Sequence, residues 1–412
     1  MGAAASARAD GATVAGLRTR LGLEGLPEGR RAELDARLND LYAEHGGDAA
    51  WAAAAGGERP GLVRAFEVAA RAIVESDPDA FRRRRLSVGA RDRADGAPVE
   101  FRSPAYDPLG GAAPAQPWPA SRVSALTYHG IEPGAAGSVA KINQDRGVVV
   151  RPFAGSPRNA LYGAFDGHGE FGGAVAEFCA RHVVERLGAA LAGAATVAGC
   201  RAALEAAFRA ADDALAAGPV EATYSGTTAV VVVRLRGELV CGNAGDSRAV
   251  VVRRAGAAWE AVDLSRDHNP DLPDERRRIT GSGGFVSDAP EPGLSARVWL
   301  DAAQTRVGLA MSRSLGDGAA KRVGVVSDAE VAVHAVEADD AALVLASDGV
   351  WEFISSQEAA TMVGALLDTD GAEACADACR ALVDLSVRRW KENEGSYRDD
   401  ITCVVARLGG ER

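Results

Sequence analysis

Short apolar runs of strand length recur between residues 123 and 408, and longer stretches with helical spacing lie between them. The strand candidates are residues 146–151, 160–165, 227–235, 238–243, 248–253, 331–336, 342–347 and 401–407. The helix candidates are residues 170–190, 200–217, 273–280, 356–367 and 372–391. Several strands follow one another through short links, which indicates antiparallel hairpins, and the helices come in pairs. This pattern predicts an α+β layered fold rather than a doubly wound parallel sheet.

The chain before residue 123 has a different character. Residues 14–80 show helical periodicity, with Leu34, Leu38 and Leu41 on one predicted face. Residues 81–122 are rich in Arg, Gly, Pro and Ala, which is typical of a linker that is largely disordered or loosely attached. We therefore expect a flexible N-terminus at 1–13, a helical extension at 14–80, a linker at 81–122 and a main domain at 123–408.

Charge and cysteine content narrow the possible functions. The 412-residue chain has a formal net charge of −11, and the excess carboxylate lies after residue 120. An acidic main domain argues against nucleic acid as a partner and allows a site that gathers carboxylates around a cation. The six cysteines are scattered in apolar or helical contexts, which predicts reduced, buried thiols. A metal or redox role for Cys375 and Cys379 is open, although helical packing explains their spacing better.

Five aspartates adjoin apolar runs and have small or polar neighbours, in KINQD, FDGHG, CGNAGDSR, ASDGVWE and YRDDIT. Any one of them alone is an ordinary turn. If packed sheets brought Asp145, Asp166, Asp246, Asp348 and Asp399 to one edge, their carboxylates would repel and would need cations. A ligand set of oxygen atoms without Cys or His favours Mg²⁺ or Mn²⁺ over zinc.

These motifs, with SGTTA (225–229) and MSRSLGD (311–317), resemble the PPM family in their order and rough spacing. The PPM family comprises the metal-dependent serine/threonine protein phosphatases of type 2C, and the resemblance covers about residues 124–407. It implies an α-β-β-α four-layer sandwich with two central antiparallel sheets. It also implies hydrolysis of phosphoserine and phosphothreonine in proteins by a hydroxide that bridges two Mg²⁺ or Mn²⁺ ions, without a covalent phosphoenzyme.

The resemblance also implies roles for individual residues. The expected metal ligands are Asp166, which bridges the two ions, the carbonyl of Gly167, and Asp348, Asp399 and Asp246, the last of these with Asp348 at a weaker third ion. Asp145 would orient a metal-bound water. His168 would be the general acid that protonates the departing serine or threonine oxygen.

The sequence departs from the family pattern at two positions. Gln144 stands where many members have a metal-binding glutamate, and Ala140 stands where many have a phosphate-clamping arginine. Lys141 would then contact the phosphate as a point charge, or it is a solvated lysine at a strand edge. Residues 267–286 resemble the family's flap. Arg276, Arg277 and Arg278 would contact substrate there, or form the solvated face of a short helix. Residues 225–229 and 311–317 are interpreted as segments that pack in the core and support the site residues.

The first residues match a lipidation pattern, because MGAAAS fits myristoylation at Gly2. The basic run Arg82–Arg85 would add a second, electrostatic membrane signal, and it also makes Ser87 a candidate for a basophilic kinase. A flexible start and a solvated linker explain the same residues. We find no apolar segment long enough to span a bilayer and no secretory leader, so we expect a cytoplasmic protein, with nuclear or membrane-peripheral location as alternatives.

Two other functions stay open. One is a catalytically weak or inactive binding protein that keeps the sandwich, which the departures at Gln144 and Ala140 would allow. The other is a metal-dependent hydrolase of small phosphorylated molecules. The presence of Asp166, Asp348, Asp399 and His168 favours an active phosphatase, with phosphorylated proteins as substrates and a monomer as the expected state.

Overall fold

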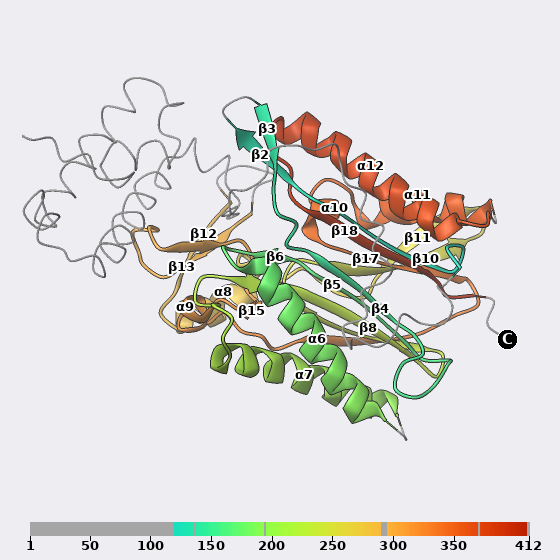
Figure 1. Ribbon diagram of the computed structural model, residues 1–412, viewed down its shortest axis with the longest axis horizontal. Helices are drawn as coiled ribbons and strands as arrows, with labels where there is room; N and C mark the ends of the chain where they lie inside the picture. Colours follow the sequence, from blue (N-terminus) through green and yellow to red (C-terminus); the bar gives the residue numbers. More distant parts are fainter. Residues whose placement is uncertain (1–118, 135–136, 193–194, 290–294, 370, 410–412) are drawn as a thin grey trace, which may run out of the picture. The chain divides into compact units, whose positions relative to one another are not determined.

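The computed structural model describes residues 119–134, 137–192, 195–289, 295–369 and 371–409. The predictions for the N-terminus, the helical extension and nearly all of the linker lie outside this part, as do Gly2, Arg82–Arg85 and Ser87. Within the described residues, two antiparallel five-stranded sheets pack against each other, and a pair of helices covers each outer face (Figure 1). This arrangement confirms the four-layer α-β-β-α fold.

The first sheet joins segments from both ends of the described chain. Its order is β1 (Val123–Tyr128), β18 (Ile401–Arg407), β17 (Asp340–Ala346), β10 (Arg248–Ala255) and β11 (Ala258–Asp263), and all neighbours are antiparallel. Strand β1 is absent from the strands predicted from the sequence. Every residue of this strand, VSALTY, is only half-buried, so its apolar and polar positions do not alternate clearly along the sequence.

The second sheet has the order β16 (Glu330–Ala335), β9 (Glu238–Ala244), β8 (Ala229–Leu235), β5 (Ala160–Phe165) and β4 (Arg146–Val150). Its neighbours are also antiparallel. Central strands β5 and β8 are almost entirely buried, which explains why they read as continuous apolar runs rather than as alternating ones.

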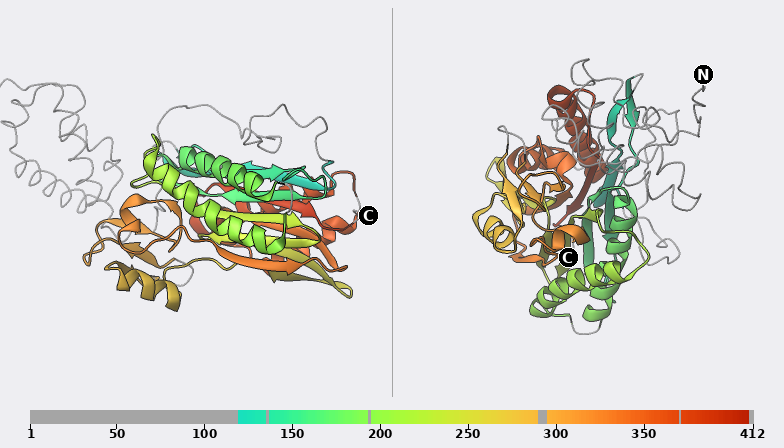
Figure 2. Two further views of the ribbon diagram at one scale, coloured as in Figure 1. Left: turned by 90° about the horizontal axis from the view of Figure 1, so that it is seen from below. Right: turned by 90° about the vertical axis from the view of Figure 1, so that its left-hand side faces the viewer.

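Helices α6 (Gly172–Leu191) and α7 (Val197–Ala217) cover the second sheet, and α11 (Ser356–Asp368) and α12 (Ala374–Glu394) cover the first. Figure 2 shows the green pair and the red pair on opposite sides of the sheets. Local signals begin two of them: Thr196 Oγ1 accepts from Gly199 N–H at 3.0 Å, and Ser355 Oγ accepts from Glu358 N–H at 3.2 Å. None of the described helices is long and apolar enough to cross a bilayer.

Three apolar layers hold the sandwich together. One lies between α6, α7 and the second sheet, one between α11, α12 and the first sheet, and the third between the two sheets, where Val230, Val251 and Leu345 meet. Burial of this apolar surface is the main favourable contribution to folding. All six cysteines are free and buried, as expected.

Short elements build one end of the sandwich. Two-residue strands β15 (Leu315–Gly316), β7 (Gly226–Thr227) and β6 (Gly167–His168) form a small sheet there. Beside this end lie α8 (Pro273–Gly281), α9 (Gly318–Lys321) and a second small sheet of β12 (Phe285–Ser287), β13 (Arg297–Trp299) and β14 (Val307–Leu309) (Figures 1 and 2). The remaining elements are the hairpin β2 (Ile131–Gly134) and β3 (Gly137–Ala140), and α10 (Asp348–Trp351).

Candidate active site

The five predicted aspartates all lie at strand ends. Asp145 precedes β4 and Asp166 follows β5, and the register places Arg146 opposite Phe165. In the first sheet, Arg248 of β10 lies opposite Ala346 of β17, and Ala346 lies opposite Cys403 of β18. Asp246, Asp348 and Asp399 flank these strand ends. Antiparallel pairing therefore brings five segments, far apart in the sequence, to one edge of the sandwich.

The electrostatic interactions of Asp166 are consistent with a shared neighbourhood for these carboxyl groups. Burial raises the pKa of Asp166 well above its ordinary value, and repulsion from Asp145, Asp348, Asp399 and Asp246 raises it further. Asp166, Asp348 and Asp399 stay partly exposed to solvent. The arrangement gathers more negative charge than Lys141, the lysine beside Asp399, balances, which favours a bound cation or a proton.

Asp145 lies deepest among these carboxylates, with 2% of its surface exposed. Its Oδ2 accepts a hydrogen bond from Ser347 Oγ at 2.8 Å, whereas its Oδ1 is buried without a hydrogen-bond partner. Burial, and then repulsion from Asp400, raise the pKa of Asp145 to about 7. One of its oxygens is therefore left for a water or an ion.

Asp400 is a sixth carboxylate that the sequence analysis missed. Its Oδ1 accepts the Gly130 N–H, and its Oδ2 accepts the Gln144 N–H at 2.8 Å. It thus ties the KINQD segment, at Gln144, to the chain just before β18. The signal in the sequence was the doubled aspartate of YRDDIT, of which only Asp399 was given a role.

Lys141 and Gln144 have clear partners. Lys141 is 7% exposed, and its Nζ donates to Asp399 Oδ1 at 2.6 Å. Burial opposes its charge, but Asp399, Tyr397 and Asp400 outweigh burial and raise the pKa of Lys141 well above its ordinary value. Gln144 Nε2 donates to the carbonyl of Gly169 at 2.7 Å, so its amide fixes the DGHG turn. The alternative that Lys141 is a solvated lysine at a strand edge is therefore wrong. The contact of Lys141 with the phosphate stays a prediction.

His168 lies on β6 and contacts a carboxylate that the motif analysis did not assign. Its Nε2 lies 2.7 Å from Oδ2 of Asp317, the residue that follows β15. Burial opposes protonation of His168, but the charge and hydrogen bond of Asp317 outweigh it and raise the pKa of the imidazole. MSRSLGD was interpreted as a packing segment, although its final aspartate could have been recognised as a candidate partner.

The donor set of this edge suits a hard divalent cation. Its side chains offer carboxylate oxygens, and Asp145 Oδ1 lacks a hydrogen-bond partner. The Gly167 backbone is packed too closely to accept a side chain, because an added Cβ would lie 2.4 Å from the Gly172 carbonyl oxygen. As the side chains stand, the described residues contain no group of three His, Cys, Asp or Glu that could hold one ion. Mg²⁺ commonly takes one or two carboxylates and completes its shell with water, which these residues can provide.

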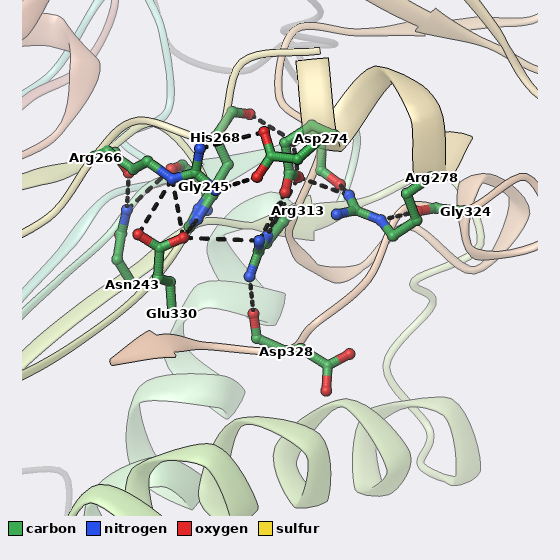
Figure 3. A network of polar contacts seen from close by, with 12 residues as sticks. Asn243, Gly245, Arg266, His268, Asp274, Arg278, Arg313, Gly324, Asp328 and Glu330 are labelled. Atoms are coloured by element: carbon green, nitrogen blue, oxygen red, sulfur yellow. Dashed lines mark hydrogen bonds and ion pairs between the residues drawn. The ribbon is translucent and has the colours of Figure 1, made fainter. Parts of the chain in front are cut away.

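The three flap arginines have different surroundings. Arg278 Nη2 donates to Glu275 Oε2 at 2.7 Å and to the Ser312 carbonyl at 2.8 Å, and its Nε donates to the Gly324 carbonyl at 2.8 Å. Figure 3 shows Arg278 directed inward, toward Arg313 and Gly324. Arg276 pairs with Asp288, and Arg277 is exposed on α8. Arg278 is therefore engaged in holding the flap, and Arg277 is the most accessible of the three.

His268 connects this network to the loop that carries Asp246. It is fully buried, its N–H donates to the Gly245 carbonyl at 2.9 Å, and its Nδ1 accepts the Gly245 N–H at 3.2 Å (Figure 3). Gly245 has φ +117°, and a Cβ there would lie 2.7 Å from Thr228 Cβ. Contacts with His268 and Thr228 therefore hold the loop before Asp246 in place, and this fixes the position of the Asp246 backbone.

Glu275 is the buried centre of the same network. It accepts hydrogen bonds from Arg278, from Ser312 Oγ and from Arg313, whose Nη2 lies 2.7 Å from Glu275 Oε1. Burial opposes its ionisation, but these donors outweigh burial and hold the pKa of Glu275 well below its ordinary value. Glu275 is therefore ionised and joins α8 to residues 312–313.

Replacing Glu275 with glutamine is expected to lower the free energy of unfolding by about 3 kcal/mol at pH 7, because it removes the buried anion that two partly buried guanidinium groups share. The folded-state pKa is depressed, so this stabilisation is present above the pKa of the unfolded chain and is lost as pH falls through the folded-state pKa. Urea unfolding at pH 7, pH 4 and pH 2 would measure both effects, because most of the loss is expected below pH 4.

The matched control is Asp274→Asn on the same helix. Asp274 pairs with Arg266, but its side chain is 45% exposed, so its loss should cost less than about 1 kcal/mol. Equal unfolding midpoints for the two variants at pH 7 would contradict a structural role for the buried carboxylate.

Comparison with known proteins agrees with this geometry. The family model described as protein phosphatase 2C matches residues 138–395. "Probable protein phosphatase 2C 64" of Oryza sativa subsp. japonica is 36% identical over 281 residues, which are 66% of this chain and 63% of that protein. "Probable protein phosphatase 2C 48" of the same organism is 36% identical over 287 residues, which are 64% of this chain and 79% of that protein.

Solved structures share the fold. A serine-threonine phosphatase 2C from Toxoplasma gondii superposes with a TM-score of 0.58 at 21% identity and covers 69% of this chain and 95% of its own. A C. elegans sex determining protein gives a TM-score of 0.54 at 16% identity, covering 97% of this chain and 87% of its own. The matching family model, the similar relatives and the shared sandwich lead to one conclusion: this chain belongs to the protein phosphatase 2C family.

Proposed function

We propose that this protein hydrolyses phosphoserine and phosphothreonine in other proteins in a reaction that requires Mg²⁺ or Mn²⁺. The observation that carries the proposal is the gathering of Asp145, Asp166, Asp246, Asp348 and Asp399 at one edge of the sandwich in a member of this family. A cluster of this kind opposes folding unless it serves to bind cations, because the carboxylates repel one another. The chain spans 63% and 79% of the two rice relatives, so the substrates of the whole protein belong to the proposal.

The ions would be held by Asp166, the Gly167 carbonyl, Asp348 and Asp399, with Asp246 and Asp348 at a weaker third ion. When bound, such ions would supply an activated water and neutralise the phosphoryl oxygens. Asp145, with one unpartnered oxygen, would orient the attacking water. Lys141 adds a buried positive charge beside Asp399, close to where the phosphate would lie.

His168 would deliver a proton to the departing serine or threonine oxygen. An alkoxide is a poor leaving group, so a positioned proton donor lowers the barrier to its departure. The imidazole lies on β6, two residues after Asp166, and part of its side chain is exposed. Arg277 on the flap would contact acidic or phosphorylated groups that flank the target residue.

The test is hydrolysis of p-nitrophenyl phosphate and of a phosphothreonine peptide by the full chain, with Mn²⁺, with Mg²⁺ and with EDTA. We expect turnover of both substrates with a divalent ion and none in EDTA, with activity restored when the metal is added back. A phosphorylated sugar in a parallel reaction distinguishes a hydrolase of small molecules.

A folded protein, by circular dichroism, that turns over neither substrate with either metal would contradict the proposal. That result would favour an inactive binding protein, with Gln144 and Ala140 as the first substitutions to reverse, to Glu and Arg. Turnover that is unchanged in EDTA would also contradict a metal-dependent mechanism.

A further inference from the structure

We propose that Asp317 is a positioning residue for His168, which holds the imidazole in one orientation and one tautomer. The inference rests on the proposed function only for its consequence in catalysis. The two side chains meet at 2.7 Å, Nε2 to Oδ2, and both are largely buried, with 13% and 6% of the side chains exposed. Nothing in the chain order suggests the pair, because 149 residues separate them.

The small sheet at the site end of the sandwich brings the pair together. Gly226 of β7 lies opposite His168 of β6 and also opposite Gly316 of β15. β7 is therefore the centre of a three-strand ribbon with His168 on one side and the residue before Asp317 on the other. An added Cβ on Gly226 would lie 2.1 Å from Asp317 Oδ2 and 2.7 Å from His168 Nε2. The pair occupies the space that a side chain at position 226 would fill.

Asp317 is itself held in place by independent contacts. Its N–H donates to the Ser225 carbonyl at 2.9 Å, and its Oδ2 accepts a second hydrogen bond, from Ser314 Oγ at 2.6 Å. Its backbone is left-handed, with φ 51°. A non-glycine residue adopts this conformation at a cost, and such strain is commonly retained where the side chain has a task. The carboxylate therefore has little freedom to follow the imidazole if the ring rotates.

This geometry assigns different tasks to the two ring nitrogens. Nε2 carries a proton that it donates to Asp317, because a carboxylate can only accept. Nδ1 is buried and has no hydrogen-bond partner among the described residues, so it is the ring nitrogen left to take a partner, which we infer to be the leaving oxygen of the substrate. Without Asp317, the ring can rotate or change tautomer and no longer aims Nδ1 at the leaving oxygen.

Comparing the two substrates distinguishes loss of a positioned proton donor from a general loss of active-site structure. A threonine alkoxide needs a proton as it leaves, whereas p-nitrophenolate is stable and needs none. In Asp317→Asn, we expect kcat for a phosphothreonine peptide to fall roughly 100-fold, with kcat for p-nitrophenyl phosphate within about threefold of the wild type and KM little changed. His168→Asn should give the same pattern, and the double variant should lose no more than either single one, because the residues act as a unit.

Asp212→Asn is the matched control. Asp212 on α7 accepts the Gly316 N–H at 2.7 Å and pairs with Lys321 at 3.1 Å, so it contacts the same ribbon, and no hydrogen bond joins it to His168. It should lower both activities equally or neither. An equal loss on both substrates in Asp317→Asn, or additive losses in the double variant, would overturn the proposal.

A spectroscopic measurement keeps the inference testable if the wild type shows no phosphatase activity. In ¹⁵N-histidine spectra of the full chain, the His168 signal, identified by its absence in His168→Asn, should report a protonated Nε2 in the wild type and a mixture of tautomers in Asp317→Asn. An unchanged signal would overturn the inference. If Asp317→Asn fails to fold, Ser314→Ala removes one hydrogen bond to the same carboxylate oxygen. This variant should give a smaller loss of activity that again affects the peptide more than p-nitrophenyl phosphate. Equal losses on both substrates would overturn the inference.

Discussion

Asp166→Asn is expected to lower metal-dependent turnover of p-nitrophenyl phosphate and of a phosphothreonine peptide by roughly 1,000-fold. Asp166 lies at the centre of the carboxylate cluster, since the four other predicted aspartates all raise its pKa. The amide keeps the shape of the side chain but removes the charge that would bridge two ions. Steady-state rates with saturating Mn²⁺ would measure the loss.

The same substitution should have the opposite effect on stability without metal. Because burial and like charges raise the pKa of Asp166, its ionisation at neutral pH opposes folding, and neutral asparagine removes this cost. We therefore expect a higher Tm for Asp166→Asn than for the wild type in EDTA, and a smaller gain in Tm when Mn²⁺ is added. Thermal unfolding with and without Mn²⁺ measures both.

Asp213→Asn, an exposed position on α7, is the control for loss of one carboxylate. It should change neither the rate nor the response to Mn²⁺. A variant Asp166→Asn that keeps full turnover, or that gains as much Tm from Mn²⁺ as the wild type, would show that the ions bind elsewhere.

Trp390→Ala is expected to lower the free energy of unfolding by about 3–5 kcal/mol. Trp390 on α12 is 2% exposed and makes edge contacts with Phe353, at 4.8 Å between ring centroids, and with Tyr397, at 5.8 Å. Truncation leaves a cavity between α12 and the first sheet that its rigid neighbours cannot fill. Urea unfolding followed by circular dichroism would measure the change.

Trp390→Phe separates packing from the link to the site. Trp390 Nε1 donates to the Gly349 carbonyl at 2.7 Å, next to Asp348, and Tyr397 Oη donates to Asp399 Oδ2 at 3.1 Å. Phenylalanine keeps most of the volume of the ring but lacks the indole N–H that donates to the Gly349 carbonyl. Trp390→Phe should therefore lower the free energy of unfolding less than Trp390→Ala, and it should lower turnover because Gly349 is held less firmly. Equal stability of Trp390→Ala and the wild type would contradict the role of this ring in the core.

The layered fold was predictable because its signal is local. Burial leaves an apolar pattern within a short stretch of sequence. This pattern is visible in the valine-rich run of β8 and in the helical spacing of α6, α7, α11 and α12. β1 and β11 escaped prediction because their residues are mostly half-buried or exposed, so the contrast between apolar and polar positions is weak. The segment predicted as one strand at 227–235 is divided into β7 and β8, because Thr228 between them donates its N–H to the Asp166 carbonyl at 2.9 Å.

The sequence by itself determined a layered α+β fold, the five aspartates at strand ends and the family resemblance that implied the sandwich, because apolar periodicity and short motifs are properties of neighbouring residues. Only the tertiary structure decided the partners: Asp317 for His168, Asp399 for Lys141, Asp400 for the Gln144 N–H, and Glu275 for Arg313. All but the last are contacts between segments more than 100 residues apart. They depend on which strands pair and in which register, and that is set by packing of the whole domain rather than by any local pattern.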